Sequence, residues 1–170
     1  MSAQARHAPA VGLNFRREVA AGDAAAVRAI VASTGFFSAA EVDVAVELVE
    51  DRLSRGEKSD YRFLFAESIG RAIGYACYGP IACTVSSFDL YWIAVHADHQ
   101  GEGVGRRLMQ ESERAVAAEG GRRIYVETSS RPQYEPTRNF YLRCGYKVEA
   151  TLEDFYSPGD GKVILVKPIV

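Results

Sequence analysis

The spacing of apolar and polar residues along the chain predicts a mixture of strands and helices. Stretches rich in β-branched and aromatic residues are typical of strands, and apolar residues at every third or fourth position are typical of helices. Strands are predicted over residues 13–19, 61–67, 71–78, 87–95, 123–128, 146–155 and 162–166. Helices are predicted over residues 24–32, from a cap at Ser38 to Leu53, from about 103 to 119, and over 137–144.

The ends of these helices carry recognisable signals. Asp23 is a candidate N-cap for the first helix, because its carboxylate can accept hydrogen bonds from unpaired N–H groups. Ser38, followed by Glu41 three residues later, forms a capping box that opens the second helix. The Gly-Gly pair at 120–121 ends the long helix, and Gly145 ends the last one.

The predicted order β-α-α-β-β-β-α-β-α-β-β indicates the fold class. A strand, a long helix and a strand in the middle imply a parallel pair, whereas the flanking hairpins imply antiparallel pairs. We therefore expect a mixed α/β (α+β) fold, with a mostly antiparallel sheet and a central parallel strand pair, flanked by helices. The 170 residues fit a single domain over 13–170 that follows a flexible, Ala-rich tail over 1–12.

Composition and charge exclude several classes of function. The 20 Lys and Arg residues against 22 Asp and Glu give a net charge of -2, without the basic footprint of a nucleic-acid-binding protein. No apolar run approaches the length that crosses a bilayer, so we expect no membrane partner. The tail lacks the apolar segment of a signal peptide, and the three cysteines show no pairing pattern. A cytoplasmic protein is expected.

A glycine-rich segment, His99-Gln100-Gly101-Glu102-Gly103-Val104-Gly105-Arg106-Arg107, lies between a predicted buried strand and the start of a helix. Glycines let the backbone approach a ligand closely, and the first N–H groups of a helix attract anions. The segment therefore reads either as a phosphate cradle or as an ordinary turn between a strand and a helix. Neither a Walker A loop nor a dinucleotide-binding GxGxxG motif fits its letters.

The pattern that fits is Gln-x-x-Gly-x-Gly, at Gln100, Gly103 and Gly105, directly after a strand that ends Trp-Ile-Ala-Val. Together with the later run Asn139-Phe140-Tyr141-Leu142-Arg143-Cys144-Gly145-Tyr146, it resembles the GNAT superfamily of N-acetyltransferases. The resemblance implies the GNAT fold, in which the central parallel pair splays around acetyl-coenzyme A (acetyl-CoA). It also implies transfer of an acetyl group from this cosubstrate to a primary amine.

The resemblance assigns roles to particular residues. The backbone of Ile93 and Val95 would pair with the pantetheine arm, and the Val95 N–H would polarise the thioester carbonyl. Tyr141 would be the general acid for the leaving thiolate, although a tyrosine in an aromatic helix can equally be a core residue. Asn139 would bind the coenzyme or cap its own helix. The pyrophosphate would be held by Gln100, Gly101, Gly103, Val104, Gly105 and Arg106.

The base is the least determined part of the expected site. Glu127 resembles the glutamate that serves as base in the ribosomal-protein N-acetyltransferase branch, although extra residues over 131–136 separate it from the last helix. Its alternative is a solvated residue at the end of a strand, and Asp89 is the second candidate base. Phe36 and Phe37, and the turn over 154–160, would form the walls of an acceptor site, or else a helix staple and a plain hairpin.

No metal is expected, because His96 and His99 lack a third ligand at metal-binding spacing. Cys144 has no neighbouring histidine to activate it, which favours direct attack without an acyl-enzyme. The acceptor would be an amine on a small molecule or a peptide, and homodimers are common in the family. The alternative function is a non-catalytic sensor or regulatory module that binds acyl-CoA.

Overall fold

The structure is a computed structural model that describes residues 12–169. The tail predicted over 1–12 lies outside the described residues, apart from Gly12. The chain forms two compact units, one of residues up to 77 with 92–108, and one of residues 78–91 with 109 onwards. The boundaries fall inside two strands and one helix, and each unit is treated by itself below.

The observed elements follow the predicted order. The strands are β1 (Asn14–Arg16), β2 (Arg62–Ser68), β3 (Arg71–Pro80), β4 (Ser87–Val95), β5 (Arg123–Ser129), β6 (Lys147–Ser157) and β7 (Asp160–Pro168). The helices are α1 (Asp23–Ser33), α2 (Ala39–Arg55), α3 (Val104–Ala118) and α4 (Glu135–Arg143). Short 3-10 helices occupy Gly56–Lys58, Ala97–His99 and Pro132–Tyr134.

The strands hydrogen-bond in the order β1-β2-β3-β4-β5-β7-β6, and β4 and β5 are parallel neighbours. The pairs β1–β2, β5–β7 and β6–β7 are antiparallel. The predicted mixed sheet with a central parallel pair is therefore confirmed. The parallel register runs from Ser87↔Arg123 to Asp89↔Tyr125, which is only the first part of β4.

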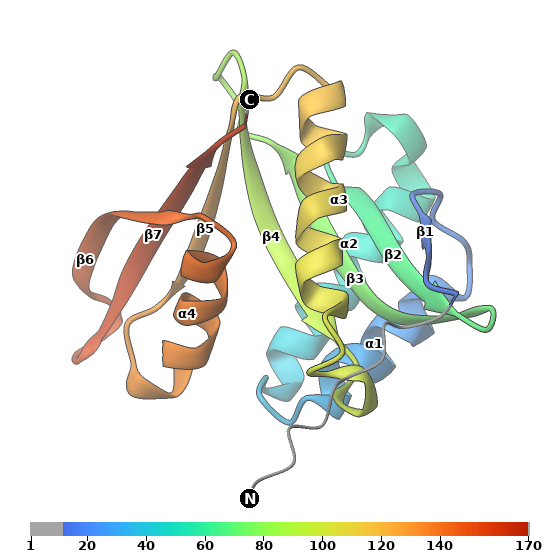
Figure 1. Cartoon of the computed structure of the whole chain (residues 1–170), viewed down its shortest axis with the longest axis horizontal. Coiled ribbons are helices and arrows are strands. Elements are labelled where there is room, and N and C mark those ends of the chain that lie inside the picture. The colour runs from blue at the N-terminus through green and yellow to red at the C-terminus, as the bar shows by residue number, and fades with distance from the viewer. Residues whose placement is uncertain (1–11, 170) are drawn as a thin grey trace, which may run out of the picture. The chain divides into compact units, whose positions relative to one another are not determined.

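In the first unit, helices α1 and α2 cover one face of the strands and α3 begins on the other (Figure 1). The core beneath α1 and α2 takes alternate residues of β2 and β3, among them Phe63, Phe65 and Tyr75. On the opposite face Gly74 leaves room for Leu108 of α3, since a Cβ there would lie 3.0 Å from Leu108 Cδ1. The period-two pattern that predicted these strands thus places aromatic side chains on the helix-covered face.

In the second unit, α4 lies over the strands β5 and β7 (Figure 1). Val126 of β5 and Leu165 of β7 are paired across the strands and are buried. Glu127 and Ile164, the next pair in the register, therefore belong to the opposite face of the sheet. The candidate base and the buried core of this unit lie on different faces.

Strand β6 is the edge of the sheet and is interrupted twice. Its register with β7 shifts between Val148 and Ala150 and again between Leu152 and Ser157. Asp154, inside the second irregular stretch, has a positive φ of 52°. Such bulges bend a strand and leave residues out of the ladder.

Asp23 does not cap α1, and that prediction is wrong. Gly22 is the N-cap, while Asp23 is the first helical residue and is buried. Its carboxylate instead accepts two hydrogen bonds from Arg16, both 2.8 Å long, and one from the Ala20 N–H at 2.7 Å. The partly buried Arg16 guanidinium outcompetes the helix amides because charge-assisted bidentate bonds are stronger.

The capping box is confirmed, since the Ser38 side chain accepts from the Glu41 N–H and the Glu41 side chain accepts from the Ser38 N–H. The first strand is shorter than predicted and ends at Arg16, which is still in register with Phe65. The last two strands are longer than predicted, because they pair with each other along most of their length. The extra residues over 131–136 form a 3-10 turn and the first turn of α4.

Candidate active site

The C-terminal end of β4 presents backbone groups that point away from β3. The His96 N–H donates to the Ile73 carbonyl of β3 at 2.8 Å. Successive residues of a strand direct their peptide groups to opposite sides, so those of Val95 and Ile93 point away from β3. An extended ligand can add to such a strand as another strand would.

The Gln100 side chain is engaged by its own strand. Its Nε2 donates to the Val95 carbonyl at 3.1 Å, which ties the turn after β4 to the strand end. A second tie lies nearby, where the Ala97 N–H donates to Ser33 Oγ of α1 at 3.0 Å. The contact of Gln100 with a pyrophosphate stays a prediction.

The glycine turn and the first turn of α3 form a candidate anion site. Gly101 and Gly103 both have φ of +81°, which other residues rarely adopt, so glycine is required there by conformation. Gly103 accepts the first helical hydrogen bond, from the Arg107 N–H at 3.1 Å. The amides of the first turn have no partner inside the helix, and no acidic residue lies in that turn.

Arg106 and Arg107 differ in what they contact. The Arg107 guanidinium lies 5.3 Å from the centroid of the Phe15 ring, a cation–π contact within the first unit. Arg106 is exposed and has no ion-pair partner among residues 12–169. The Val104 side chain is buried and anchors the start of the helix. The segment therefore fits a pyrophosphate group, with Arg106 as the available cation.

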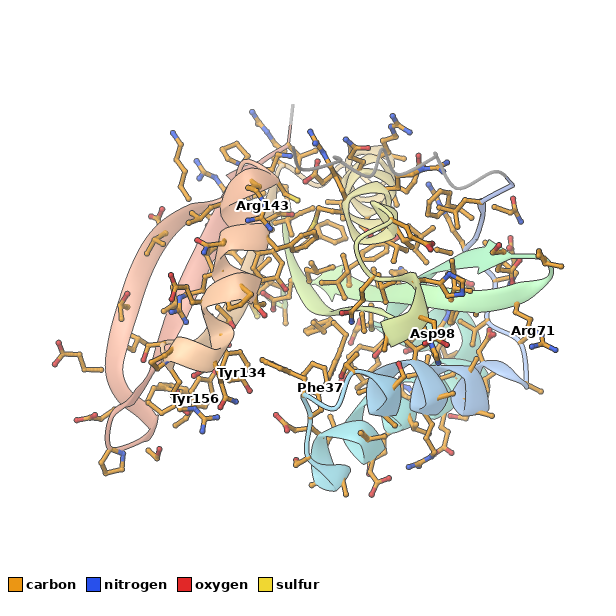
Figure 2. The ribbon with its side chains drawn as sticks, turned by 60° about the horizontal axis from the view of Figure 1, so that its bottom comes forward. Phe37, Arg71, Asp98, Tyr134, Arg143 and Tyr156 are labelled. Carbon is orange, nitrogen blue, oxygen red and sulfur yellow. The ribbon has the colours of Figure 1, made fainter. Side chains whose placement is uncertain are left out.

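The aromatic pair between α1 and α2 packs inward. The Phe36 and Phe37 rings lie 5.3 Å apart, and Phe37 lies 5.0 Å from the Trp92 ring of β4. Phe37 (labelled in Figure 2) is thus partly buried against the core of the first unit. Its role as an acceptor wall stays a prediction beside this packing role.

In the second unit, α4 places Tyr141 in a buried position with 6% of its surface exposed. Its ring lies 5.9 Å from that of Tyr146. The Tyr141 hydroxyl makes no hydrogen bond to any residue that the structure describes. Burial, with a smaller contribution from Cys144, raises the pKa of Tyr141 above its ordinary value of 10.0, so the side chain keeps its proton.

Glu127 forms an ion pair that the sequence did not indicate. Its Oε2 lies 2.6 Å from Nζ of Lys162, and Lys162 also lies 3.8 Å from the centroid of the Phe155 ring. Lys162 opens a short predicted strand, and nothing in the linear spacing marks it as the partner of a residue 35 positions earlier. The pairing arises from the register of β5 with β7.

Asp89 lies on the same face as Glu127, since it pairs with Tyr125, two residues before Glu127. Burial raises the pKa of Asp89 above its ordinary value of 3.8, the negative charge of Glu127 raises it further, and Lys162 opposes the shift. A raised pKa brings this carboxyl closer to the range in which a base accepts protons near neutral pH. The two candidate bases are therefore coupled to one another.

A second charged cluster lies at the start of β7. The buried Asp160 accepts from the Ser129 hydroxyl and pairs with Arg131 at 3.1 Å. Tyr134 and Tyr156 lie at the same end of α4, opposite the end that carries Arg143 (Figure 2). Burial raises the pKa of Tyr156, and the positive charge of Lys162 opposes this rise.

The remaining candidates are Asn139 and the two histidines near the glycine turn. Asn139 is exposed on α4, and its contact with a coenzyme stays a prediction. His96 Nδ1 accepts from the Asp98 N–H, and His99 Nδ1 lies 3.3 Å from Glu102 Oε2. Within residues 12–169 no group of His, Cys, Asp and Glu side chains is arranged to hold a metal. None of the helices described combines the length and the apolar composition needed to cross a membrane.

A sequence profile of the acetyltransferase (GNAT) domain matches residues 59–148, more than half of the chain. The chain belongs to the GNAT family of acetyltransferases. A crystal structure assigned to this GNAT family, from Desulfovibrio desulfuricans, is 45% identical, with a TM-score of 0.92 and coverage of 94% of this chain and 100% of that one. No curated protein matched the sequence.

More distant GNAT structures share the fold alone. An aminoglycoside 6'-N-acetyltransferase complexed with coenzyme A is 17% identical, with a TM-score of 0.73 over 93% of this chain and 97% of that one. The ribosomal-protein-S18-alanine N-acetyltransferase of Escherichia coli is 16% identical, with a TM-score of 0.70 over 92% and 94%. Their names state two unlike acceptors, so the fold does not fix the acceptor of this GNAT protein.

Proposed function

We propose that this GNAT protein transfers the acetyl group of acetyl-CoA to a primary amine, by direct attack in a ternary complex. The observation that carries the proposal is the candidate anion site at the start of α3, where the first turn carries no acidic residue and Arg106 has no ion-pair partner among residues 12–169. These features suit the pyrophosphate of coenzyme A. Membership of the GNAT family supports the acetyl transfer itself.

Each residue then has one chemical task. A carboxylate, Glu127 in the first instance, takes a proton from the ammonium form of the acceptor. The freed nitrogen lone pair attacks the thioester carbon, while the Val95 N–H donates a hydrogen bond to the carbonyl oxygen as its charge grows. The carbon–sulfur bond then breaks, and Tyr141 gives its proton to the thiolate. The attacking nitrogen loses its second proton to solvent, which leaves the neutral amide. Solvent restores the proton of Tyr141, and the carboxyl returns its proton to solvent.

The free oxygen of Glu127 supports its role. Lys162 contacts Oε2, and Oε1 makes no hydrogen bond within the described part of the chain. Glu127 is about half exposed, with 48% of its side chain accessible, so an amine can reach it. Asp89 is the second candidate, because its raised pKa suits a proton acceptor.

The pH dependence of two variants tests the base. An alkylamine with a pKa of about 10.4 is neutral in only about one molecule in 2,500 at pH 7. Glu127→Gln should therefore slow the reaction strongly near neutral pH, and the defect should shrink toward about pH 9 to 10, where solvent supplies neutral amine. Asp89→Asn should show no such recovery. If the two variants exchange behaviours, Asp89 is the base.

The activity itself is tested by following thiol release from acetyl-CoA over a panel of amines, small molecules and peptides included. Mass spectrometry then identifies the acetylated product. Amine-dependent release at a rate above hydrolysis is the expected result. Binding of acetyl-CoA without release to any amine would favour the acyl-CoA sensor instead.

A further inference from the structure

Lys162 shares one face of the second unit's sheet with both candidate bases. Ser129 pairs with Lys162 and Glu127 pairs with Ile164, so these four residues lie on one face. The parallel pair Asp89↔Tyr125 adds Asp89 to the same face. Val126 and Leu165, on the opposite face, are buried in the core. Two carboxylates and one ammonium therefore lie on the same face of the sheet, opposite the face that carries Val126 and Leu165.

The contacts of Lys162 hold its ammonium in place from two sides. Nζ lies 2.6 Å from Glu127 Oε2, 3.8 Å from the Phe155 ring centroid and 5.9 Å from that of Tyr156. Only 13% of the Lys162 side chain is exposed. A desolvated ammonium persists where a carboxylate and aromatic faces replace the lost water. The strand β7 and the hairpin residues of β6 thus fix a positive charge beside Glu127.

The neighbouring charged and titratable groups leave Lys162 as the cation that acts on Asp89 and Glu127. Asp160 is satisfied by Ser129 and Arg131, at the start of β7. Tyr156 of β6 has a pKa raised first by burial and also by Glu127, Asp160 and Tyr134, with Lys162 opposing. Asp89 of β4 is influenced by Glu127 and Lys162.

We propose that Lys162 is a positioning residue for proton transfer, which holds the Glu127 side chain in one orientation and keeps a positive charge beside the two candidate bases. The proposal rests on the proposed function, because it concerns the base of that reaction. In this role Lys162 acts through Glu127, which it contacts directly, and not on the reacting atoms. It acts through its charge, because an adjacent cation stabilises ionised carboxylates. Where no cation is near, two adjacent carboxylates resist being ionised at the same time.

The test compares the pH profile of kcat/KM in wild type and Lys162→Met. Removing the cation makes the carboxylate pair bind its proton more tightly, so the acid limb moves to higher pH. We expect a displacement of about half to one pH unit, allowing for the solvent exposure of Glu127. Lys162→Arg should restore the wild-type limb. Lys147→Met, which removes an exposed lysine at the start of β6, is the matched control and should not move it.

A second variant separates charge from packing. Phe155→Leu removes the aromatic face but leaves the ammonium and its carboxylate, and Phe155 is half exposed, so the fold tolerates the change. It should move the limb less than Lys162→Met does. An unchanged acid limb in Lys162→Met, or an equal displacement in Lys147→Met, overturns the proposal.

A measurement without turnover distinguishes this proposal from the proposed function. The carboxyl ¹³C resonance of Asp89, assigned with Asp89→Asn, is titrated in both proteins, and its midpoint should rise in Lys162→Met. If that midpoint rises but no amine is acetylated by wild type, the proposed function fails and the electrostatic role of Lys162 stands. If amines are acetylated and neither the midpoint nor the acid limb moves, Lys162 has only a structural role.

Discussion

Two neighbouring tyrosines of the second unit should respond oppositely to the loss of a hydroxyl group. Tyr141 and Tyr146 have rings 5.9 Å apart and both are buried. The Tyr146 hydroxyl donates to Met109 Sδ at 3.2 Å, whereas the Tyr141 hydroxyl makes no hydrogen bond to the described residues. Burial raises the pKa of both, so each keeps its proton at working pH.

Tyr141→Phe should lower kcat by about 10²-fold, the lower end of the range for a lost general acid, which corresponds to about 2.7 kcal/mol of transition-state stabilisation. The free energy of unfolding should change by less than about 0.5 kcal/mol, because no hydrogen bond is lost and the ring remains. Tyr146→Phe should lose about 0.5–1 kcal/mol of stability through its bond to sulfur, with kcat within about twofold of wild type. The phenylalanine variants differ from wild type by one oxygen each and are therefore matched.

The assays are urea unfolding for stability and single-turnover acetyl transfer at saturating acetyl-CoA for the chemical step. Single-turnover conditions matter because product release can hide a slowed chemical step. If Tyr141→Phe transfers the acetyl group at the wild-type rate, Tyr141 is a core residue and the thiolate takes its proton from elsewhere. A larger rate loss in Tyr146→Phe would reverse the two assignments.

Three further variants test other parts of the structure. Gly105→Asp, which puts a carboxylate in the first turn of α3, should weaken coenzyme A binding more than tenfold in calorimetry while the circular dichroism spectrum stays unchanged. Asp23→Asn should cost about 2–3 kcal/mol in urea unfolding, since it removes one of the two carboxylates that pair with the Arg16 guanidinium. Arg16→Met in the same background should cost less than it does in wild type. Asp89→Asn should raise stability at pH 7 by up to about 1 kcal/mol and leave it unchanged near pH 3. The sign follows because the pKa of Asp89 is raised in the folded protein above its unfolded value of 3.8. Above the folded pKa the charged carboxylate therefore destabilises the folded state, and below the unfolded pKa the carboxyl is neutral in both states and has no such effect.

Local patterns predicted the parts of the fold that depend on neighbouring residues. Strand β4 was predicted with its observed bounds, because its dense aromatic and apolar residues have a single interpretation. The Ser38–Glu41 capping box was also confirmed, since its partners are three residues apart. The glycine turn before α3 could be located from its letters, because positive φ angles at Gly101 and Gly103 require glycine.

The partners of other polar side chains could not be predicted, whether they lie a few residues away or on another strand. Asp23 has the local features of a helix cap, yet Arg16 from the first strand takes its carboxylate. Nothing in the letters indicated that the Gln100 side chain bonds to the Val95 carbonyl, and its contact with a pyrophosphate stays a prediction. Lys162 carries no sequence signal, because its partner Glu127 is set by strand register. In all three cases a long polar side chain (Arg16, Gln100 or Lys162) can reach several partners, and the folded backbone decides which one it contacts.

The two interruptions of β6 affect whether its exposed edge can pair with a strand of another molecule. An uninterrupted outer strand offers a full row of N–H and C=O groups to another chain, the usual starting point for uncontrolled aggregation. The register shifts after Val148 and Leu152, with the left-handed Asp154, divide that row into short pieces. At the other edge, β1 is only three residues long. Neither outer strand therefore offers a long template for β-sheet growth, and exposed aliphatic residues on β6 such as Val148 and Leu152 can persist there without seeding fibres.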